Sequence, residues 1–153
     1  MNKPLKRIGI AAAALTVAVA FSACSGKAVD SNDGGDDAEV LTGAGVSGTT
    51  ITLGVMGDLT GPFAGLNSQQ NRGSQLYWDE VNAAGGVCGT YTVELDIRDH
   101  GYNVQNAVSL YPQLAPNVVA FQNYVGGSHI MANLEALERD SRLTIVSAAT
   151  PAL

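Results

Sequence analysis

Small polar residues that could bind an anion lie between residues 123 and 128, after one of the predicted strands. Gly127 and Ser128 stand where a helix is predicted to begin, so backbone N–H groups there lack partners within the helix. These groups favour negative charge, and the small glycine lets a ligand approach the backbone closely. A small carboxylate would suit such a site. The alternative is that Ser128 is simply the N-cap of the helix.

The other reactive residues do not form a catalytic or metal-binding pattern. His100 follows Asp99, but this pair lacks the third, oriented nucleophile that a catalytic triad needs. Residues 126–130 are not a nucleophile elbow, because isoleucine replaces the second glycine of G-x-S-x-G. Two histidines and one cysteine in the folded region are too few for a metal cluster. We therefore predict no enzyme activity, no cofactor and no metal, and we expect His129 to be a surface helix residue.

Two apparent motifs in the first third of the chain do not indicate binding sites. Residues 43–48 spell the dinucleotide pattern G-x-G-x-x-G, but that motif must follow a strand and open a helix, whereas this copy precedes a strand. The acidic residues between 30 and 37 lack the ligand spacing and the closing glutamate of a calcium loop. A solvated segment explains both better.

The elements that must position Ser128 are predicted from residue 49 onward. Strands are predicted at 50–56, 92–98, 118–122 and 143–146 from their β-branched and apolar residues. Helices are predicted at 68–84, at 103–110 with Asn103 as N-cap and Pro112 as breaker, and at 128–140. Helical spacing turns the following residues toward the sheet: Gly73, Leu76, Tyr77, Val81, Ala84, Val104, Ala107, Val108, Tyr111, Leu114, Ile130, Met131, Leu134 and Leu137.

The alternation of strands and helices predicts the fold class. It indicates an α/β fold with a parallel sheet, right-handed crossovers and helices on both faces. In such a sheet every loop that leads from a strand to a helix lies at one edge, so this edge collects residues 58–65, 99–103, 123–128 and 147–151. Open α/β sheets bind ligands in the crevice at that edge.

The N-terminus has the pattern of an export signal. Lys3, Lys6 and Arg7 precede an apolar run at 8–21, which is shorter than the roughly 20 residues of a transmembrane helix. Ala23 before Cys24 resembles a bacterial lipobox, in which the cysteine is lipidated, although Phe21 stands where leucine or valine is usual. We predict a signal peptide at 1–23 and lipidation of Cys24. The alternative is an ordinary cleaved signal.

Residues 24–48 are predicted to form a flexible, lipid-anchored tether. They are rich in serine, glycine and aspartate and contain too little apolar surface to fold. Removing residues 1–23 leaves five basic residues against 14 acidic ones, a net charge of −9. Such an acidic chain, which has no basic stripe, is not expected to bind nucleic acid.

Several motifs resemble one family in order and spacing. They are GDLTGPFAG after the first strand, VNAAGGVCG at the end of the first helix, Asp99, the loop 126–128, and SAATP at 147–151. Together they resemble the periplasmic binding proteins that serve amino-acid ABC importers, and most closely the Leu/Ile/Val-binding type. The resemblance covers residues 49–153, which we expect to be the first part of an N-terminal, Rossmann-like ligand-binding lobe.

The resemblance implies a role for particular residues. Ser128 and Thr150 would donate hydrogen bonds to the carboxylate of a ligand, with Gly127 beside them, and Ala149 would offer its carbonyl to an ammonium group. The turn from Thr60 to Phe63 would border the pocket. The implied partners are a small amino acid or amide, the permease subunits of an ABC importer, and the outer face of the bacterial cell membrane, reached through the lipid anchor.

The identity of the ligand stays open, because residues 123–125 are bulkier than the small residues that often precede the serine of this family. Family members have two lobes and more than twice this length, so we expect the chain to be an N-terminal part of a longer protein or a truncated product. Alone, it should bind amino acids weakly. The alternatives are a sensory receptor domain of the same fold and, less favoured, a flavodoxin-like enzyme.

Overall fold

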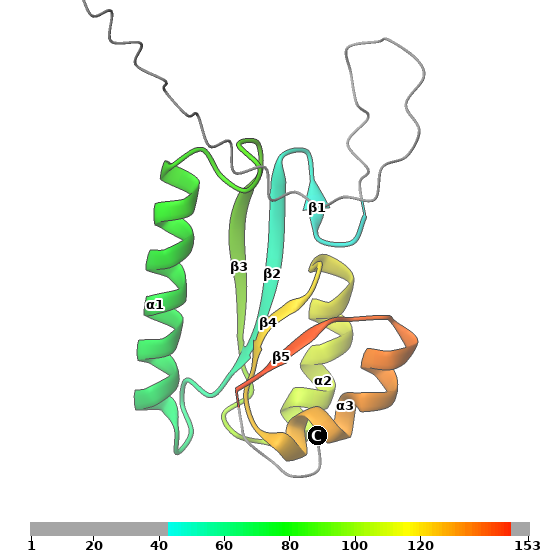
Figure 1. The fold of residues 1–153 in the computed structure, drawn as a ribbon. Helices are drawn as coiled ribbons and strands as arrows, with labels where there is room; N and C mark the ends of the chain where they lie inside the picture. Colours follow the sequence, from blue (N-terminus) through cyan, green and yellow to red (C-terminus); the bar gives the residue numbers. More distant parts are fainter. Residues whose placement is uncertain (1–42, 148–153) are drawn as a thin grey trace, which may run out of the picture. The chain divides into compact units, whose positions relative to one another are not determined.

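The computed structural model describes residues 43–147 (Figure 1). The predicted signal peptide at 1–23, the lipidation site Cys24, and the candidate ligand residues Ala149 and Thr150 lie outside the described residues. The elements are β1 (Val46–Ser47), β2 (Thr50–Gly57), α1 (Ala64–Ala83), β3 (Thr92–Asp99), α2 (Val104–Leu114), the 3-10 helix η1 (Ala115–Asn117), β4 (Phe121–Tyr124), α3 (Gly127–Arg139) and β5 (Thr144–Val146).

The sheet is parallel apart from one short strand, and β2 lies at its centre. β3 pairs with β2 along its whole length, from Thr50 with Thr92 to Gly57 with Asp99. β4 pairs with the second half of β2 on the opposite side, and β5 pairs with β4. α1 covers one face, while α2 and α3 cover the other (Figure 1). The predicted α/β class, with helices on both faces of a parallel sheet, is therefore confirmed.

The apolar core lies between the sheet and the helices α2 and α3. Alternation along β2 points Met56 into this core, where it meets buried side chains of β4 and both helices. Tyr111 of α2 is buried as well, and its hydroxyl donates to Ala136 O at 3.1 Å and to Asp140 Oδ2 at 3.1 Å. Burial and the contact with Asp140 raise the pKa of Tyr111 to about 12, so the phenol stays protonated and keeps α2 and α3 together.

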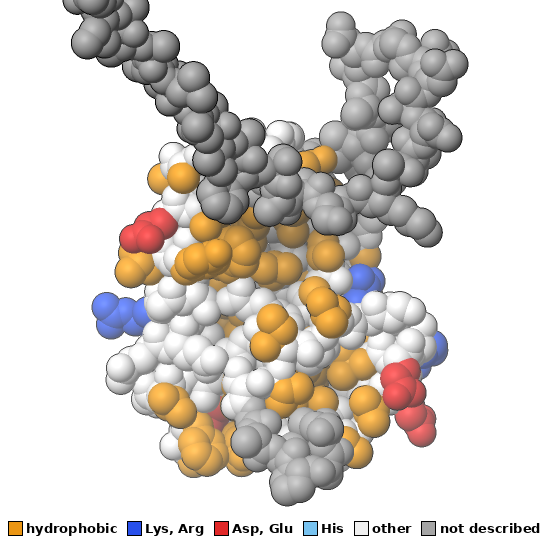
Figure 2. All heavy atoms as spheres, viewed as in Figure 1, with side chains coloured by type: hydrophobic (Ala, Val, Ile, Leu, Met, Phe, Trp, Pro, Cys, Tyr) orange, Lys and Arg blue, Asp and Glu red, His pale blue; other side chains and the backbone are white. Residues whose placement is uncertain are grey.

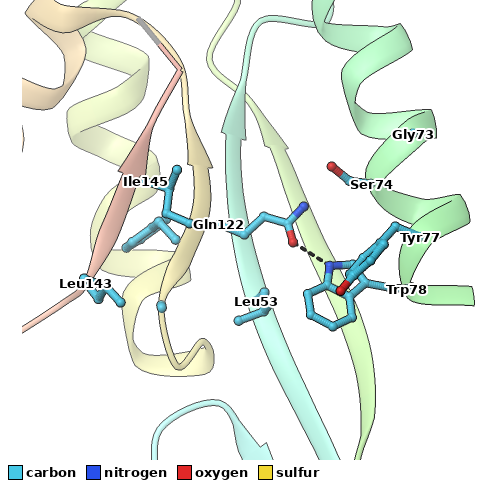
Figure 3. A pocket seen from close by; sticks show the side chains of 10 residues that line it. Leu53, Gly73, Ser74, Tyr77, Trp78, Gln122, Leu143 and Ile145 are labelled. Carbon is cyan, nitrogen blue, oxygen red and sulfur yellow. Dashed lines mark hydrogen bonds between the residues drawn. The ribbon is translucent and has the colours of Figure 1, made fainter. Parts of the chain in front are cut away.

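The face covered by α1 packs much less closely. The described residues of α1 that are buried are Asn67 and Asn71, whereas Leu76 and Tyr77, which were predicted to face the sheet, are 61% and 58% exposed. An open apolar groove of about 550 Å³ separates this helix from β4 and β5. Gln122 extends from β4 toward α1, where its Oε1 accepts from Trp78 Nε1 at 2.5 Å (Figure 3). Figure 2 shows apolar side chains gathered over this side of the sheet.

The inward faces predicted for the other two helices are mostly correct. Ala107, Tyr111 and Leu114 are buried in α2, as are Ile130 and Leu137 in α3. The prediction is wrong for Val108 and Met131, which are 40% and 44% exposed. Both lie at the edge of the apolar face of their helix. Spacing along the sequence does not decide whether a residue at that edge is covered by the core or faces solvent.

Four predicted boundaries are corrected by the structure. The predicted tether runs too far, because Val46–Ser47 form β1 and pair antiparallel with Thr50 and Ile51, aided by left-handed turns at Gly45 and Gly48. α1 begins at Ala64, four residues before the predicted start. β4 begins at Phe121, because Val118 turns into the core beside η1. Finally, α2 continues through Pro112, which lies in its last turn and so removes one terminal hydrogen bond.

The cap of α2 provides a test of the fold. Asn103 Oδ1 accepts from the N–H groups of Gln105 and Asn106 at 2.8 and 3.2 Å, as predicted for an N-cap. We expect Asn103→Ala to lower the free energy of unfolding of the full-length protein by about 1 kcal/mol, measured by urea denaturation. Gln105→Ala, in the exposed first turn of the same helix, is the matched control and should have little effect. Equal stability of Asn103→Ala and wild type would contradict the assigned cap.

Candidate functional site

The order of the strands creates a crevice at one edge of the sheet. The chain leaves β2 toward β3 on one side, and β4 pairs with β2 on the other side, so the connections after β2 and β4 diverge. In open α/β sheets such a switch point is where ligands bind, next to the carboxyl ends of the strands. The loops 58–63, 100–103 and 125–126 all lie at this edge, as the sequence predicts.

The loop after β2 is held by Asp58, whose side chain is fully buried. Its carboxylate accepts the N–H groups of Gly61 at 2.6 Å and Phe63 at 2.8 Å. A side chain at Gly61 would meet Asp58 Oδ1 at 2.5 Å and the carbonyl oxygen of Gly101 at 2.7 Å, so only glycine fits there. This tight turn aims Phe63 away from the sheet and into the crevice.

Asp99, at the end of β3, ties the same loop to the neighbouring strand. Its Oδ1 accepts from the N–H groups of Leu59 and Gly101, both at 2.8 Å, and its Oδ2 accepts from the Thr60 hydroxyl at 2.7 Å. Burial alone would raise the pKa of Asp99, but these hydrogen bonds together outweigh it and lower the pKa. Thr60, a predicted ligand residue, therefore has its hydroxyl proton engaged in holding the loop.

His100 is a structural residue of this edge. It is fully buried, its Nδ1 accepts from the Tyr102 N–H at 3.1 Å, and its Nε2 lies 3.2 Å from the carbonyl oxygen of Val125. This pattern fits the neutral tautomer that carries its proton on Nε2. Burial and the nearby His129 lower the pKa of His100, which also favours the neutral ring. His100 thus links the loops that follow β3 and β4.

His129 is buried, and its predicted surface position is wrong. The side chain is 1% exposed, and its ring stacks on that of His100, with centroids 4.5 Å apart. Gly126 makes this possible, because its φ of 92° belongs to the left-handed region and a side chain there would collide with the His129 ring. The sharp turn at Gly126 leaves room for the His129 ring to pack against that of His100, a contact that no local sequence pattern indicates.

Ser128 lies in the first turn of α3 and is exposed. The N-cap is Gly126, without a side-chain hydrogen bond, so the alternative in which Ser128 caps the helix is wrong. The Ser128 hydroxyl lies 3.4 Å from His129 Nδ1, a long contact that a ligand could replace. Gly127 and Ser128 are the first two residues of the helix, where backbone N–H groups have no partner four residues earlier.

A small cavity of about 160 Å³ opens at this edge. Its lining comes from the loops after β2, β3, β4 and β5 and from the first turns of α1: Phe63, Leu66, Asn67, Gln70, Tyr102, Val125, Gly126 and Ser147. Of the predicted residues, Phe63 lines this cavity, and Gly127 and Ser128 directly follow the lining residue Gly126. Thr60 does not line the cavity but holds the loop that carries Phe63 through its bond to Asp99. Complete ligand pockets occupy roughly 300–1,000 Å³, so this cavity is the size of a partial site.

Sequence reasoning missed part of the lining. Leu66 and Asn67 were overlooked because the predicted helix starts after them, whereas Gln70 lies inside the predicted helix and nothing in the pattern marks it. Tyr102 and Ser147 lie in loops that the sequence assigns to this edge, but nothing in the pattern marks those particular side chains. Ser147 joins the edge by accepting from Gln70 Nε2 at 3.0 Å and by a short hydrogen bond from its hydroxyl to Asn123 Oδ1.

The bulk of residues 123–125 does not fill the cavity. Asn123 and Tyr124 are buried, and the Tyr124 hydroxyl accepts from Asn133 Nδ2 at 2.6 Å inside the core. Burial raises the pKa of Tyr124 far above its ordinary value, so its hydroxyl stays protonated. Val125 lines the cavity. Within residues 43–147 we find no group of three or more His, Cys, Asp and Glu side chains arranged to hold a metal ion.

The part of the chain that the structure describes also contains no helix with the length and apolar character needed to cross a membrane. This finding concerns residues 43–147 alone and does not bear on the predicted signal peptide.

Comparisons with known proteins agree with this geometry. A sequence model of the periplasmic binding protein family matches residues 50–152. The fatty acid ABC transporter substrate-binding protein from Thermomonospora curvata is 46% identical with a TM-score of 0.70, over 72% of this chain and 28% of that one. The branched-chain amino acid transporter substrate-binding protein from Streptococcus pneumoniae, solved with isoleucine, is 27% identical with a TM-score of 0.54. The match covers 66% of this chain and 29% of that one.

A curated relative gives the same family. The Leu/Ile/Val-binding protein of Rhizobium johnstonii is 32% identical over 71 residues, which make up 46% of this chain and 19% of that protein. The chain therefore spans about a fifth of this relative's length and less than a third of the solved structures.

The hydrogen bonds to Asp99 predict a pH dependence. Because the pKa of Asp99 is lower in the folded protein than in the unfolded chain, its contribution to stability is complete above about pH 4 and is lost as the pH falls toward the folded pKa. We expect urea unfolding between pH 6 and pH 2 to show a smaller acid-dependent loss of stability for Asp99→Asn than for wild type. Parallel curves for the two proteins would contradict this role of Asp99.

Proposed function

This chain belongs to the periplasmic binding protein family, and we propose that it captures a small carboxylate-bearing solute outside the cytoplasm for an ABC importer. Our first candidate ligand is an amino acid or amide of the branched-chain type. Support comes from a curated relative that is a Leu/Ile/Val-binding protein and from a solved relative that holds isoleucine. The protein would act by binding alone, without catalysis or a cofactor.

The observation that carries this proposal is the pairing of an anion-favouring helix start with an apolar wall. Gly127 and Ser128 begin α3 at the carboxyl end of the sheet, where the positive end of the helix dipole and the exposed Ser128 hydroxyl can receive a carboxylate. Phe63 lines the adjoining cavity and is 45% exposed. A molecule with an anionic head and an apolar body fits both features.

The loop after β2 would act as a rigid support for the ligand. Asp58 and Asp99 together accept five hydrogen bonds from this loop and from Gly101, and Thr60 is one of the donors. These bonds hold Phe63 in place before any ligand arrives, which lowers the entropic cost of binding. Thr60 would therefore contribute to binding by positioning Phe63.

Two further residues would complete this half of the site. Ser147 ends the described segment at the cavity wall, and Ala149 and Thr150 follow it within a few residues. We propose that Thr150 donates to the same carboxylate as Ser128 and that Ala149 offers its carbonyl oxygen to an ammonium group. A second lobe would then close over the ligand.

A second candidate ligand is a fatty acid. It is favoured by the 46% identity to a fatty acid ABC transporter substrate-binding protein, a higher identity than that to the amino-acid proteins described above. Fatty acids and branched-chain amino acids share a carboxylate and an apolar chain, and they differ in the ammonium group. The roles proposed for Ser128 and Phe63 are the same in both cases.

The N-terminal segment would place this site at the cell surface. We propose that residues 1–23 direct export, that Cys24 is lipidated, and that the acidic segment after it tethers the folded part to the outer face of the membrane. The permease subunits of an ABC importer would then receive the ligand from the closed protein.

The lipid anchor can be tested by growing cells that express the full-length protein with a radioactive fatty acid. We expect the wild type to be labelled and Cys24→Ala to carry no label. Equal labelling of both proteins would contradict lipidation of Cys24.

The role of Ser128 can be tested by calorimetry on the full-length protein with both lobes, titrated separately with leucine and with octanoate. We expect one of these ligands to bind to the wild type and Ser128→Ala to bind it about ten- to a hundredfold more weakly, because a hydrogen bond to a charged group is lost. Ser109→Ala, on the exposed side of α2, is the matched control and should bind like wild type. Unchanged affinity in Ser128→Ala would refute the assigned role, and a wild type that binds neither ligand would refute the proposed function.

A further inference from the structure

Tyr102 has an unusual backbone conformation for an aromatic residue. Its φ is 55°, and that of Gly101 before it is 57°. The two residues form the centre of a tight turn that is closed by a hydrogen bond from the Asn103 N–H to the His100 carbonyl oxygen at 2.9 Å. Two consecutive positive φ angles favour glycine or asparagine at both positions, so a tyrosine here is strained. Strained residues of this kind cluster at binding sites.

The surroundings of Tyr102 fix both its backbone and its ring. The Tyr102 N–H donates to His100 Nδ1 at 3.1 Å. The ring packs at a tilt against both Phe63 and His129, with a centroid distance of 4.7 Å to each. His129 in turn stacks on the buried His100. The loops after β2 and β3 and the start of α3 therefore hold one aromatic ring in a defined position.

The ring is placed where a ligand would reach it. Tyr102 lines the cavity together with Phe63 and Leu66, and these three side chains are 38%, 45% and 69% exposed. Asn67, Gln70 and Ser147 supply polar groups to the same cavity. Aromatic and apolar side chains with a few polar groups among them are typical of small-molecule sites. Within the described residues the Tyr102 hydroxyl makes no hydrogen bond, so the side chain is positioned by the contacts of its ring.

We propose that Tyr102 determines ligand specificity by packing its ring against the apolar chain of the bound carboxylate. This inference rests on the proposed function and adds to it the protein surface that selects the apolar part of the ligand. A ligand that carries an apolar chain covers Phe63, Leu66 and Tyr102 and removes their exposed area from water. A small ligand such as glycine gains the contact with the start of α3 but nothing from this wall. The strained turn is the means by which the fold holds the ring at the cavity mouth.

The test compares two substitutions at Tyr102 in the full-length protein. Tyr102→Phe keeps the ring, and we expect its affinity for leucine and octanoate to stay within about twofold of wild type. Tyr102→Asn removes the ring and suits the left-handed backbone, so it should fold. We expect it to bind whichever of the two ligands the wild type prefers about tenfold more weakly, while binding of glycine changes little. Tyr77→Asn, an exposed aromatic on α1 outside this cavity, is the matched control.

The outcomes separate the inference from the proposed function. A tenfold loss confined to the ligand with the apolar chain supports the specificity role, and the preferred ligand shows whether that chain belongs to an amino acid or to a fatty acid. Equal losses for leucine and glycine, or unchanged affinity in Tyr102→Asn, overturn the inference and leave the proposed function standing. A wild type that binds neither leucine nor octanoate overturns both. If Tyr102→Asn does not fold, Tyr102→Gly, which adopts the same turn freely, takes its place.

Discussion

The candidate site depends on hydrogen bonds to the backbone N–H groups of the loops that follow the parallel strands. These groups have no partner in the sheet, so they need other acceptors within the protein. Asp58 and Asp99 meet this need: between them they accept four backbone N–H groups and one hydroxyl from the loops after β2 and β3. Because both carboxylates are used in this way, the loops are rigid without regular structure. Phe63 and Tyr102 owe their positions to this arrangement.

The two faces of the sheet show different degrees of packing. On the side of α2 and α3, buried aromatic and aliphatic residues form a continuous core that includes Phe121 and Tyr124. On the side of α1, an apolar groove stays open, and a hydrogen bond between Trp78 and Gln122 crosses it. The edge that forms the candidate site is therefore anchored to the well-packed face, through the stacked rings of His100 and His129. This firm attachment is what a preorganised binding surface needs.

The buried histidines also show how the edge combines polar and apolar chemistry. His100 uses both ring nitrogens within the protein, and the His129 ring contacts that of Tyr102 at a tilt of 50°. Both histidine rings are buried, whereas those of Tyr102 and Phe63 are partly exposed. The proposed binding of a carboxylate-bearing solute uses this aromatic surface together with the start of α3.

The sequence by itself determined the order of the elements, the parallel sheet, the edge at which the loops meet, the cap at Asn103 and the family, because these follow from local periodicity, turn residues and short motifs. Only the tertiary structure decided that His129 is buried, that Leu76 and Tyr77 are exposed, and that Tyr102 lines the cavity. The physical reason is that these outcomes depend on distant partners. The left-handed turns at Gly126 and Tyr102 redirect the chain, and the side chains that then meet come from four different loops. No local pattern contains that information.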